Sequence, residues 1–459
     1  MRGLQMAEDC RATISKSGMC VRQCVLGLLR SAFVRNVLVV MSGSAVAQAV
    51  GVVLSPVISR LFTPVDFGVF GTFTAVTGVL LSFVTLDYAQ AIMLPKLREE
   101  AGQVFVLACL VTGLVSLLCL VVCMLIPGRL LGLLQSRDPV MLGFLALAVL
   151  VGGLNACFQA WCVRVKAFKQ TSASQVVRGV SSNGLQVGLG MLKTGAAGLA
   201  LSSVLADSLA SLNLLRVVWA ELRGFMATAG WQRLKALAWE YRDFPAYSAT
   251  QNLLNAVSTG LPVVLLTHYY GIAVAGAYAF GVRLLGAPIS LITSALRQVL
   301  FQKAGETQHQ DRPLTPLFLK TTIGLFVLGG LPTVCLALWS PALFAWLFGR
   351  QWHAAGEFAR YLILWLLFVF CNQPAVLIAR LIRIQRTVFF YNVVVLMARV
   401  LTLVVGGLYL AAADCILVFS LVGAALNMAL IVLVGRALLK REGRLDWAGL
   451  RAGVLDGLG

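Results

Sequence analysis

Charged side chains lie inside stretches of this sequence that are otherwise apolar. Arg283 and Arg399 each have mostly apolar residues on both sides, and Arg178 lies early in a third such stretch. Lys320 lies one turn into a fourth. Arginine presents a planar fork of donors that suits carboxylate and phosphate groups, and lysine acts as a point charge. These residues could therefore hold an anion. Alternatively, the arginines could lock helices together and the lysine could anchor a helix end.

Two carboxylates could balance or use these charges. Asp207 lies deep in the stretch LSSVLADSLASLNLL, and Asp87 ends another apolar stretch. An isolated ionised carboxylate is costly in hydrocarbon. Asp207 could therefore pair with an arginine, bind a proton or Na⁺ as a coupling ion, or stay neutral and hydrogen-bonded. Asp87 is placed where exposure costs less, so it is the weaker candidate for ion coupling.

Other site chemistry is not indicated. The three histidines are far apart in loop-like segments, and the eleven cysteines show no paired spacing typical of metal sites. We find no nucleophile elbow and no glycine-rich phosphate loop. The net charge of +19 is scattered in short clusters rather than gathered in one stripe, which argues against nucleic-acid binding. We expect neither an enzyme nor a resident metal or cofactor.

The composition indicates the elements that must position these residues. Hydrophobic residues make up 59% of 459 residues, charged residues 12%, and the mean hydropathy is +0.88. A helix needs about 20 apolar residues to cross a bilayer. We therefore predict an all-α polytopic membrane protein with about twelve spans, centred near 37–59, 66–86, 102–126, 139–161, 173–192, 196–219, 247–267, 272–296, 318–347, 357–378, 388–410 and 415–438.

The distribution of basic residues predicts the orientation. Most of the 37 lysines and arginines fall in the tails and in alternate loops, and the opposite side would hold only Arg60, Arg129, Arg137, Lys193 and Arg350. Basic residues are retained in the cytoplasm. We therefore expect both termini in the cytoplasm of a bacterial inner membrane, with cytoplasmic tails at 1–36 and 439–459.

The two halves of the chain resemble each other. A shift of 208 residues aligns Gly68 with Gly276, and likewise Gly78 with Gly286, Ser82 with Ser290, Thr85 with Thr293 and Gln90 with Gln298. This predicts pseudo-symmetric six-helix bundles at 37–219 and 247–438 around a central cavity, the arrangement of an alternating-access transporter. In the linker 220–246 apolar residues recur at helical spacing, which predicts a helix on the membrane surface. An ordinary solvated loop is the alternative. The apolar positions are Trp231, Leu234, Leu237, Ala238 and Tyr241.

Several stretches carry a family resemblance. They are SPVISRLFTPVDFGVFGTFTAV (55–76), LDYAQAIMLPKLREEA (86–101), YRDFPAYSATQNLLNAVSTGLPVVLL (241–266) and GAYAFGVRLLGAPISLITSALRQVLFQKAGE (276–306). Together they resemble the polysaccharide transporter family, which includes O-antigen flippases, within the multidrug, oligosaccharidyl-lipid and polysaccharide exporter superfamily. The residues that carry the resemblance are Arg60, Pro64, Gly68, Pro95 in the AIMLPK stretch, Phe244 and Pro245.

The resemblance implies a substrate and partners. Such a flippase would move an undecaprenyl-diphosphate-linked oligosaccharide from the cytoplasmic to the periplasmic leaflet, for O-antigen of lipopolysaccharide or another surface polysaccharide. Its partners would be this polyprenyl-diphosphate glycan, membrane lipids and a polysaccharide polymerase. The diphosphate would lie near Arg283, Arg399, Arg178 and Lys320. Many relatives carry an Arg-Tyr-Glu type sequence where this chain has Asp87, Tyr88, Ala89 and Gln90, so that role is not transferred.

Two other functions are alternatives. An ion-coupled drug or cation antiporter of the same fold should carry acidic residues in its cavity, whereas the intramembrane charge here is mainly positive. A polytopic polysaccharide polymerase or ligase usually needs a large periplasmic loop, and the longest candidate here, 348–356, is short. Four tryptophans near span ends predict an interfacial belt; they are Trp339, Trp346, Trp352 and Trp365.

Overall fold

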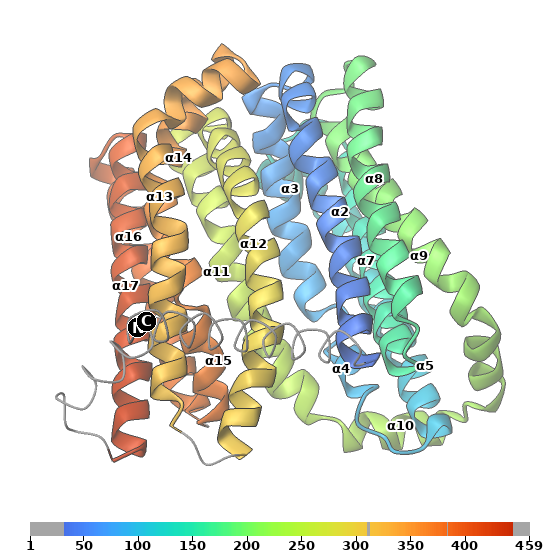
Figure 1. The fold of residues 1–459 in the computed structure, drawn as a ribbon. Helices are drawn as coiled ribbons and strands as arrows, with labels where there is room; N and C mark the ends of the chain where they lie inside the picture. Colours follow the sequence, from blue (N-terminus) through green and yellow to red (C-terminus); the bar gives the residue numbers. More distant parts are fainter. Residues whose placement is uncertain (1–31, 310–312, 383, 444–459) are drawn as a thin grey trace, which may run out of the picture.

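The computed structural model describes residues 32–309, 313–382 and 384–443. The predicted tails at 1–36 and 439–459 lie mostly outside these residues. Within them every regular element is a helix, as the composition predicts. The long helices stand side by side in two groups, one toward each side of the view (Figure 1).

The first group forms the N-terminal bundle. Its long helices are α2 (Ala32–Leu61), α3 (Pro64–Phe83), α5 (Arg98–Leu125), α7 (Val140–Arg164), α8 (Phe168–Met191) and α9 (Gly195–Thr228). The short helices α4 (Tyr88–Ala91) and α6 (Pro127–Leu134) lie between them. Thr63 and Asp66 form a capping box, and Pro64 occupies the first turn, so the local sequence specifies where α3 begins.

The second group forms the C-terminal bundle. Its helices are α11 (Ala249–Tyr270), α12 (Ile272–His309), α13 (Thr315–Phe348), α14 (His353–Cys371), α15 (Gln373–Leu381), α16 (Gln385–Tyr409) and α17 (Ala412–Arg441). A 3₁₀ turn, η2 (Arg350–Trp352), joins α13 to α14. Asn372 separates α14 from α15, and Pro374 stands in the first turn of α15.

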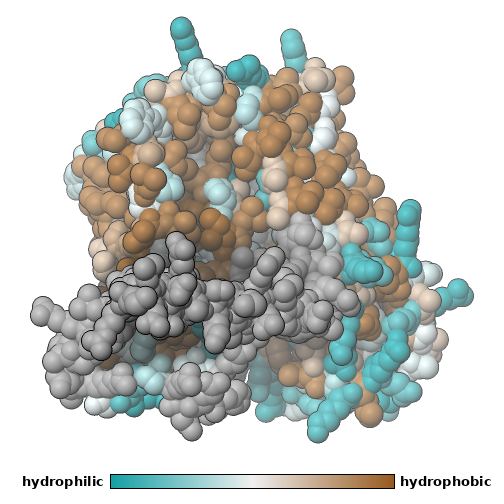
Figure 2. All heavy atoms as spheres, viewed as in Figure 1, coloured by the Kyte–Doolittle hydropathy of each residue, from teal (hydrophilic) through white to brown (hydrophobic). Residues whose placement is uncertain are grey.

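The long helices coincide with the twelve predicted windows, but not all are equally apolar. In the described part of the chain, ten helical segments are long and apolar enough to cross a membrane, and α8 and α11 fall short. Polar residues on α8 face the interior, as described below, which lowers its hydropathy. Figure 2 shows apolar side chains over most of the upper part of this face and hydrophilic ones at the lower right, at the end where α10 lies. The count of twelve spans therefore stays a prediction for α8 and α11.

The two bundles meet where α3 crosses α12. A Cβ built on Gly68 would come within 2.7 Å of Ile272 Cγ1, and one built on Gly276 within 2.6 Å of Gly68 N and closer still to the Pro64 carbonyl oxygen. The predicted shift of 208 residues pairs Pro64 with Ile272 and Gly68 with Gly276. The contact is therefore reciprocal, as expected where an axis relates two similar units.

The linker between the bundles differs in part from its prediction. The sequence predicts a linker with a surface helix at 220–246. In the structure α9 continues to Thr228, and α10 (Trp231–Glu240) follows after two residues, at the position of the predicted surface helix. Leu234 and Leu237 of α10 are buried, whereas Trp231 is exposed. The π-helix η1 (Phe244–Ser248) then leads into α11. The helix α10 is thus amphipathic and lies across the end of the N-terminal bundle (Figure 1).

At the end opposite α10, hydrogen bonds tie the bundles together. Gln351 Nε2 and Trp352 Nε1 donate to the Ser59 carbonyl oxygen at 2.7 and 2.8 Å, and Ser59 Oγ donates to the Phe348 carbonyl oxygen at 3.2 Å. The Trp352 ring packs on Phe280, with centroids 4.1 Å apart. We call Ser59, Phe348, Gln351 and Trp352 the latch. It holds the two bundles together at this end.

The latch corrects one prediction about tryptophans. Trp352 is fully buried, so it does not belong to an interfacial belt; its indole N–H is satisfied by the other bundle. Trp365 also faces the interior of its bundle, where the Arg399 guanidinium lies 5.3 Å from the centre of its ring. Trp339 and Trp346 are exposed, as a belt requires.

Candidate functional site

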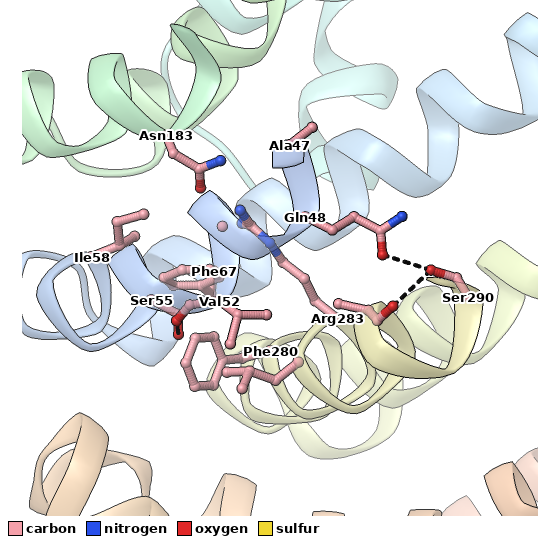
Figure 3. A pocket seen from close by; sticks show the side chains of 13 residues that line it. Ala47, Gln48, Val52, Ser55, Ile58, Phe67, Asn183, Phe280, Arg283 and Ser290 are labelled. Carbon is pink, nitrogen blue, oxygen red and sulfur yellow. Dashed lines mark hydrogen bonds between the residues drawn. The ribbon is translucent and has the colours of Figure 1, made fainter. Parts of the chain in front are cut away.

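A cavity of about 290 Å³ lies between the two bundles around Arg283. Its walls come from α2, α3, α8 and α12. Small residues open the space, since Ala47 and Gly51 of α2 and Ala287 of α12 line it. Arg283 belongs to the C-terminal bundle, and its side chain extends from α12 toward α2 and α8 of the N-terminal bundle (Figure 3). The cavity therefore presents a cation at the junction of the bundles.

Arg283 has a neutral hydrogen-bond partner. Its Nη2 donates to Gln186 Oε1 of α8 at 3.3 Å, and within the described residues no carboxylate lies in ion-pair distance of it. The side chain is exposed because it faces the cavity rather than packed protein. Most donors of this guanidinium are thus available to a ligand, and an anion is the group that such a site favours.

Two amides complete the walls around Arg283. Ser290 Oγ of α12 donates to Gln48 Oε1 of α2 at 2.8 Å, a second link between the bundles (Figure 3). Asn183 of α8 donates through Nδ2 to the Gly179 carbonyl oxygen at 2.7 Å, whereas its buried Oδ1 has no protein partner in the described part of the chain. The cavity thus offers one cation together with amide and hydroxyl groups.

A second cavity, of about 400 Å³, lies inside the N-terminal bundle next to the first. It is lined by α2, α7, α8 and α9, and it shares Ala47, Gln48 and Asn183 with the cavity around Arg283. We call it the amide pocket, because amide and hydroxyl side chains dominate its wall; they are Ser44, Gln48, Asn155, Gln159, Ser174, Gln175, Ser182, Asn183 and Ser203.

The predicted cation Arg178 lines the amide pocket and is paired. It forms an ion pair with Asp207 of α9, as the first of the three hypotheses for that carboxylate predicts. The side chain of Asp207 is 16% exposed, so it is shielded from water more than that of Arg178, at 61%. The pair neutralises both charges within the bundle, and Arg178 is therefore less available to an anion than Arg283 is.

Arg399 and Lys320 are not brought to Arg283. Arg399 lies inside the C-terminal bundle, where its Nη1 donates to Ser258 Oγ at 3.0 Å and its guanidinium faces Trp365. Lys320 is exposed in the second turn of α13 and does not line either cavity. The four cations expected near the diphosphate are thus not brought together, because Arg399 contacts α11 and α14 instead of the junction between the bundles.

Asp87 precedes α4, four residues after the end of α3, and lies outside the apolar segment Pro64–Phe83. It adopts φ +62° and is 7% exposed. Gln90 Nε2 donates to its Oδ1 at 2.7 Å, and Asn252 Nδ2 of the other bundle donates to its Oδ2 at 3.2 Å. Burial raises the pKa of the Asp87 carboxyl, and the two amide hydrogen bonds only partly oppose that effect. A carboxylate thus joins the bundles at the end opposite the latch.

The residues that carry the family resemblance have structural positions. Pro64 and Gly68 form the crossing of α3 with α12, and Arg60 is exposed at the last turn of α2. The carbonyl oxygen of Pro95 accepts from Arg164 Nη2 at 2.5 Å, and that of Met93 accepts from Nη1 at 3.2 Å. The residue pair Phe244 and Pro245 begins η1. All of these residues lie outside the cavity around Arg283.

Sequence reasoning missed the polar face of α8. Ser174, Arg178, Ser182 and Gln186 recur every four residues, which places them on one face of a helix. Three of them line the amide pocket, and the fourth holds Arg283. The spacing was available in the sequence as a signal, but a search for apolar windows averages over the face that carries it.

Comparisons with known proteins agree on a family. A family model described as "Polysaccharide biosynthesis protein" matches residues 57–357. A succinoglycan biosynthesis transport protein, ExoT of Rhizobium meliloti (strain 1021), is 32% identical over 104 residues, which cover 22% of this chain and 21% of that protein. The chain thus aligns with about a fifth of the length of this relative.

Solved structures agree on the fold. An inward-facing multidrug resistance transporter of the MATE family, in the MOP superfamily, matches with a TM-score of 0.67 at 14% identity, over 89% of this chain and 96% of that one. The lipid II flippase MurJ, in an inward closed conformation, matches with a TM-score of 0.67 at 11% identity, over 91% and 90%. Both likenesses establish a transporter fold of two helical bundles.

Proposed function

This chain belongs to the polysaccharide biosynthesis protein family, and on that premise we propose that it moves a polyprenyl-diphosphate-linked oligosaccharide across a bacterial inner membrane. The carrier in such a lipid would be undecaprenyl diphosphate, and the direction would be from the cytoplasmic to the periplasmic leaflet. The glycan would serve O-antigen or another surface polysaccharide, and a polysaccharide polymerase would use it next. We propose transport rather than catalysis.

One observation carries the proposal: Arg283 faces the cavity between the bundles and has no carboxylate partner among the described residues. A diphosphate is anionic and strongly hydrated, so it crosses hydrocarbon only if protein groups replace its water. A guanidinium can donate two parallel hydrogen bonds to phosphate oxygens. The hydrocarbon tail needs no such shelter and can remain in lipid while the head group occupies the cavity.

We propose that the end bearing α10 faces the cytoplasm. Basic residues gather there, including Arg164, Lys166, Arg233, Lys235 and Arg242, which favours the cytoplasmic side. Both termini would then be cytoplasmic, because α2 begins and α17 ends on that side of the view (Figure 1). The latch would be periplasmic, so the head group would enter from the α10 end and leave after the latch opens.

The antiporter alternative is less well supported. A carrier of organic cations needs an available carboxylate in its cavity, whereas Asp207 is paired with Arg178 and Asp87 lies before α4, outside both cavities. If a proton or Na⁺ drives the cycle, we propose Asp87 as the coupling residue. It is buried, it joins the bundles through Asn252, and no cationic side chain in the described residues pairs with it.

The test uses Arg283→Ala and Arg283→Lys. Binding of undecaprenyl diphosphate to the purified protein in nanodiscs should weaken about 10- to 150-fold in Arg283→Ala, since a charged hydrogen bond contributes about 1.5–3 kcal/mol. Arg283→Lys keeps the charge but loses the fork, so it should fall between. Arg360→Ala is the matched control, because Arg360 is exposed and donates to the Leu338 carbonyl oxygen outside the cavity.

The same variants can be tested in cells. A strain lacking the gene should accumulate lipid-linked oligosaccharide that faces the cytoplasm, and the wild-type gene and Arg360→Ala should restore export of the glycan. Arg283→Ala should insert normally and fail to restore export. Normal export by Arg283→Ala, together with unchanged binding of undecaprenyl diphosphate, would refute the proposed role of the cavity.

A further inference from the structure

We propose that the amide pocket is the site that holds the sugar next to the diphosphate, and that it selects an uncharged, hydroxyl-rich sugar. This inference rests on the function proposed above. It concerns a second cavity, which has its own walls and its own chemistry. The argument uses its connection to Arg283, the hydrogen-bonding groups on its wall and its charge.

The amide pocket adjoins the cavity around Arg283. Ala47, Gln48 and Asn183 line both, so a ligand whose anionic group lies on Arg283 can extend past these residues into the N-terminal bundle. In a lipid-linked oligosaccharide the first sugar is attached directly to the diphosphate. The amide pocket is thus placed where that sugar can lie when the diphosphate contacts Arg283.

The wall of the amide pocket offers both donors and acceptors. Gln175 Oε1 accepts from Ser44 Oγ, which leaves its Nε2 as a donor. Gln159 Nε2 donates to Asn155 Oδ1, which leaves its Oε1 as an acceptor. Neither remaining group has a protein partner in the described part of the chain. Since each sugar hydroxyl donates one hydrogen bond and accepts others, such a mixture suits a sugar better than it suits an ion of one sign.

Other contacts fix these amides in place. Asn155 Nδ2 donates to Ser211 Oγ of α9 at 2.9 Å, and Ser174 Oγ donates to the Ala210 carbonyl oxygen at 3.0 Å. The wall between α7, α8 and α9 is therefore held by hydrogen bonds within the bundle, and the groups that point into the pocket are preorganised. Preorganisation reduces the entropy lost when a ligand binds.

Charge and size indicate the kind of sugar. Arg178 is the charged residue among those that line the amide pocket, and Asp207 neutralises it. A uronic acid would meet no unpaired cation there. The remaining lining residues are small, namely Gly179, Ala206 and Ala210 beside Ala47, and leave room for a ring. The absence of a lining carboxylate also argues against a cation site in this pocket.

The experiment compares two ligands on four proteins. The ligands are the lipid-linked oligosaccharide extracted from the membranes of the source organism and undecaprenyl diphosphate without sugar. The proteins, in nanodiscs, are the wild type, Gln159→Leu, Gln175→Leu and Gln103→Leu. Gln103 is a buried glutamine of α5 outside both cavities, so its replacement by leucine is a matched control.

We expect the wild type and Gln103→Leu to bind the glycosylated lipid more tightly than the bare diphosphate lipid. Gln159→Leu and Gln175→Leu should each reduce that preference by about 10-fold, as expected for a lost hydrogen bond whose partner stays desolvated, and should bind the bare lipid as the wild type does. Gln175→Glu, which keeps the shape and removes the donor, should reduce the preference in the same way and guards against misfolding of the leucine variants.

The outcomes separate this inference from the function on which it rests. An unchanged preference in Gln159→Leu, Gln175→Leu and Gln175→Glu would overturn the sugar site while leaving the role of Arg283 intact. Failure of the wild type to bind either lipid would instead overturn the proposed function. Sugar analysis of the extracted lipid adds a second criterion, because an acidic sugar attached directly to the diphosphate would contradict the proposed selectivity.

Discussion

The substitution Gly276→Ala tests whether the crossing of α3 and α12 holds one end of the protein closed. The added Cβ would lie within 2.6 Å of Gly68 N and closer to the Pro64 carbonyl oxygen. Both are backbone atoms, which cannot rotate away as a side chain does, so the helices must separate. Overpacking of this kind costs about 1–3 kcal/mol. The cost falls on the state in which the crossing and the latch are closed.

A cost of about 1–3 kcal/mol on one conformation changes its population relative to another by about 5- to 150-fold. Spin labels at Arg137 in the N-terminal bundle and Ala354 in the C-terminal bundle, both exposed, would report the separation of the bundles near the latch. We expect longer distances between the labels in Gly276→Ala than in the wild type, measured by pulsed electron paramagnetic resonance in nanodiscs.

The same helix supplies the control. A Cβ on Gly286, ten residues further along α12, would meet nothing within 4 Å, so Gly286→Ala should leave both the distances and the thermal stability unchanged. If Gly276→Ala showed the distances and the melting temperature of the wild type, the crossing would not be tight enough to control the conformation, and the reasoning from its backbone contacts would be refuted.

Two further predictions concern the end at which α10 lies. Burial raises the pKa of Asp87, so between its unfolded and folded pKa values the native chain binds more protons than the unfolded chain, and the free energy of unfolding falls as the pH rises. Asp87→Asn should make the melting temperature less dependent on pH in thermal melts between about pH 4 and 8. Parallel curves for the variant and the wild type would contradict this prediction. Arg164→Ala removes the donors to the carbonyl oxygens of Met93 and Pro95, so trypsin should cleave this variant at Lys96 faster than it cleaves the wild type. The control is Arg129→Ala, whose exposed side chain lies at the other end of the protein. Equal cleavage rates in all three proteins would show that Arg164 does not hold this loop.

The helices were predictable because their signal is local. An apolar run of spanning length specifies a helix in lipid whatever it packs against, since the backbone must satisfy its own hydrogen bonds there. The start of α3 was equally local, because Thr63, Pro64 and Asp66 provide the capping residues. The repeat also left a sequence signal. Its aligned glycines Gly68 and Gly276 are in direct contact where the bundles meet.

The site was predictable only in part, because side-chain placement depends on which helices are neighbours. Arg283 and Arg399 have similar apolar surroundings in the sequence, yet one faces the junction of the bundles and the other faces Trp365 within one bundle. Trp346 and Trp352 are only six residues apart, and one is 76% exposed while the other is fully buried. No spacing rule separates such pairs, because the difference comes from contacts between bundles.

The pairing of Arg178 with Asp207 also bears on how the protein enters the membrane. Alone, α8 is not apolar enough to cross, and an arginine or aspartate at the centre of a helix costs about 2.5–3.5 kcal/mol on insertion. Since α9 follows α8 after a short turn and carries Asp207, the two helices can leave the translocation machinery as one hairpin whose charges cancel. We expect that in Asp207→Leu α8 fails to insert into the bilayer during synthesis. A glycosylation reporter in the turn near Lys193 would detect this failure.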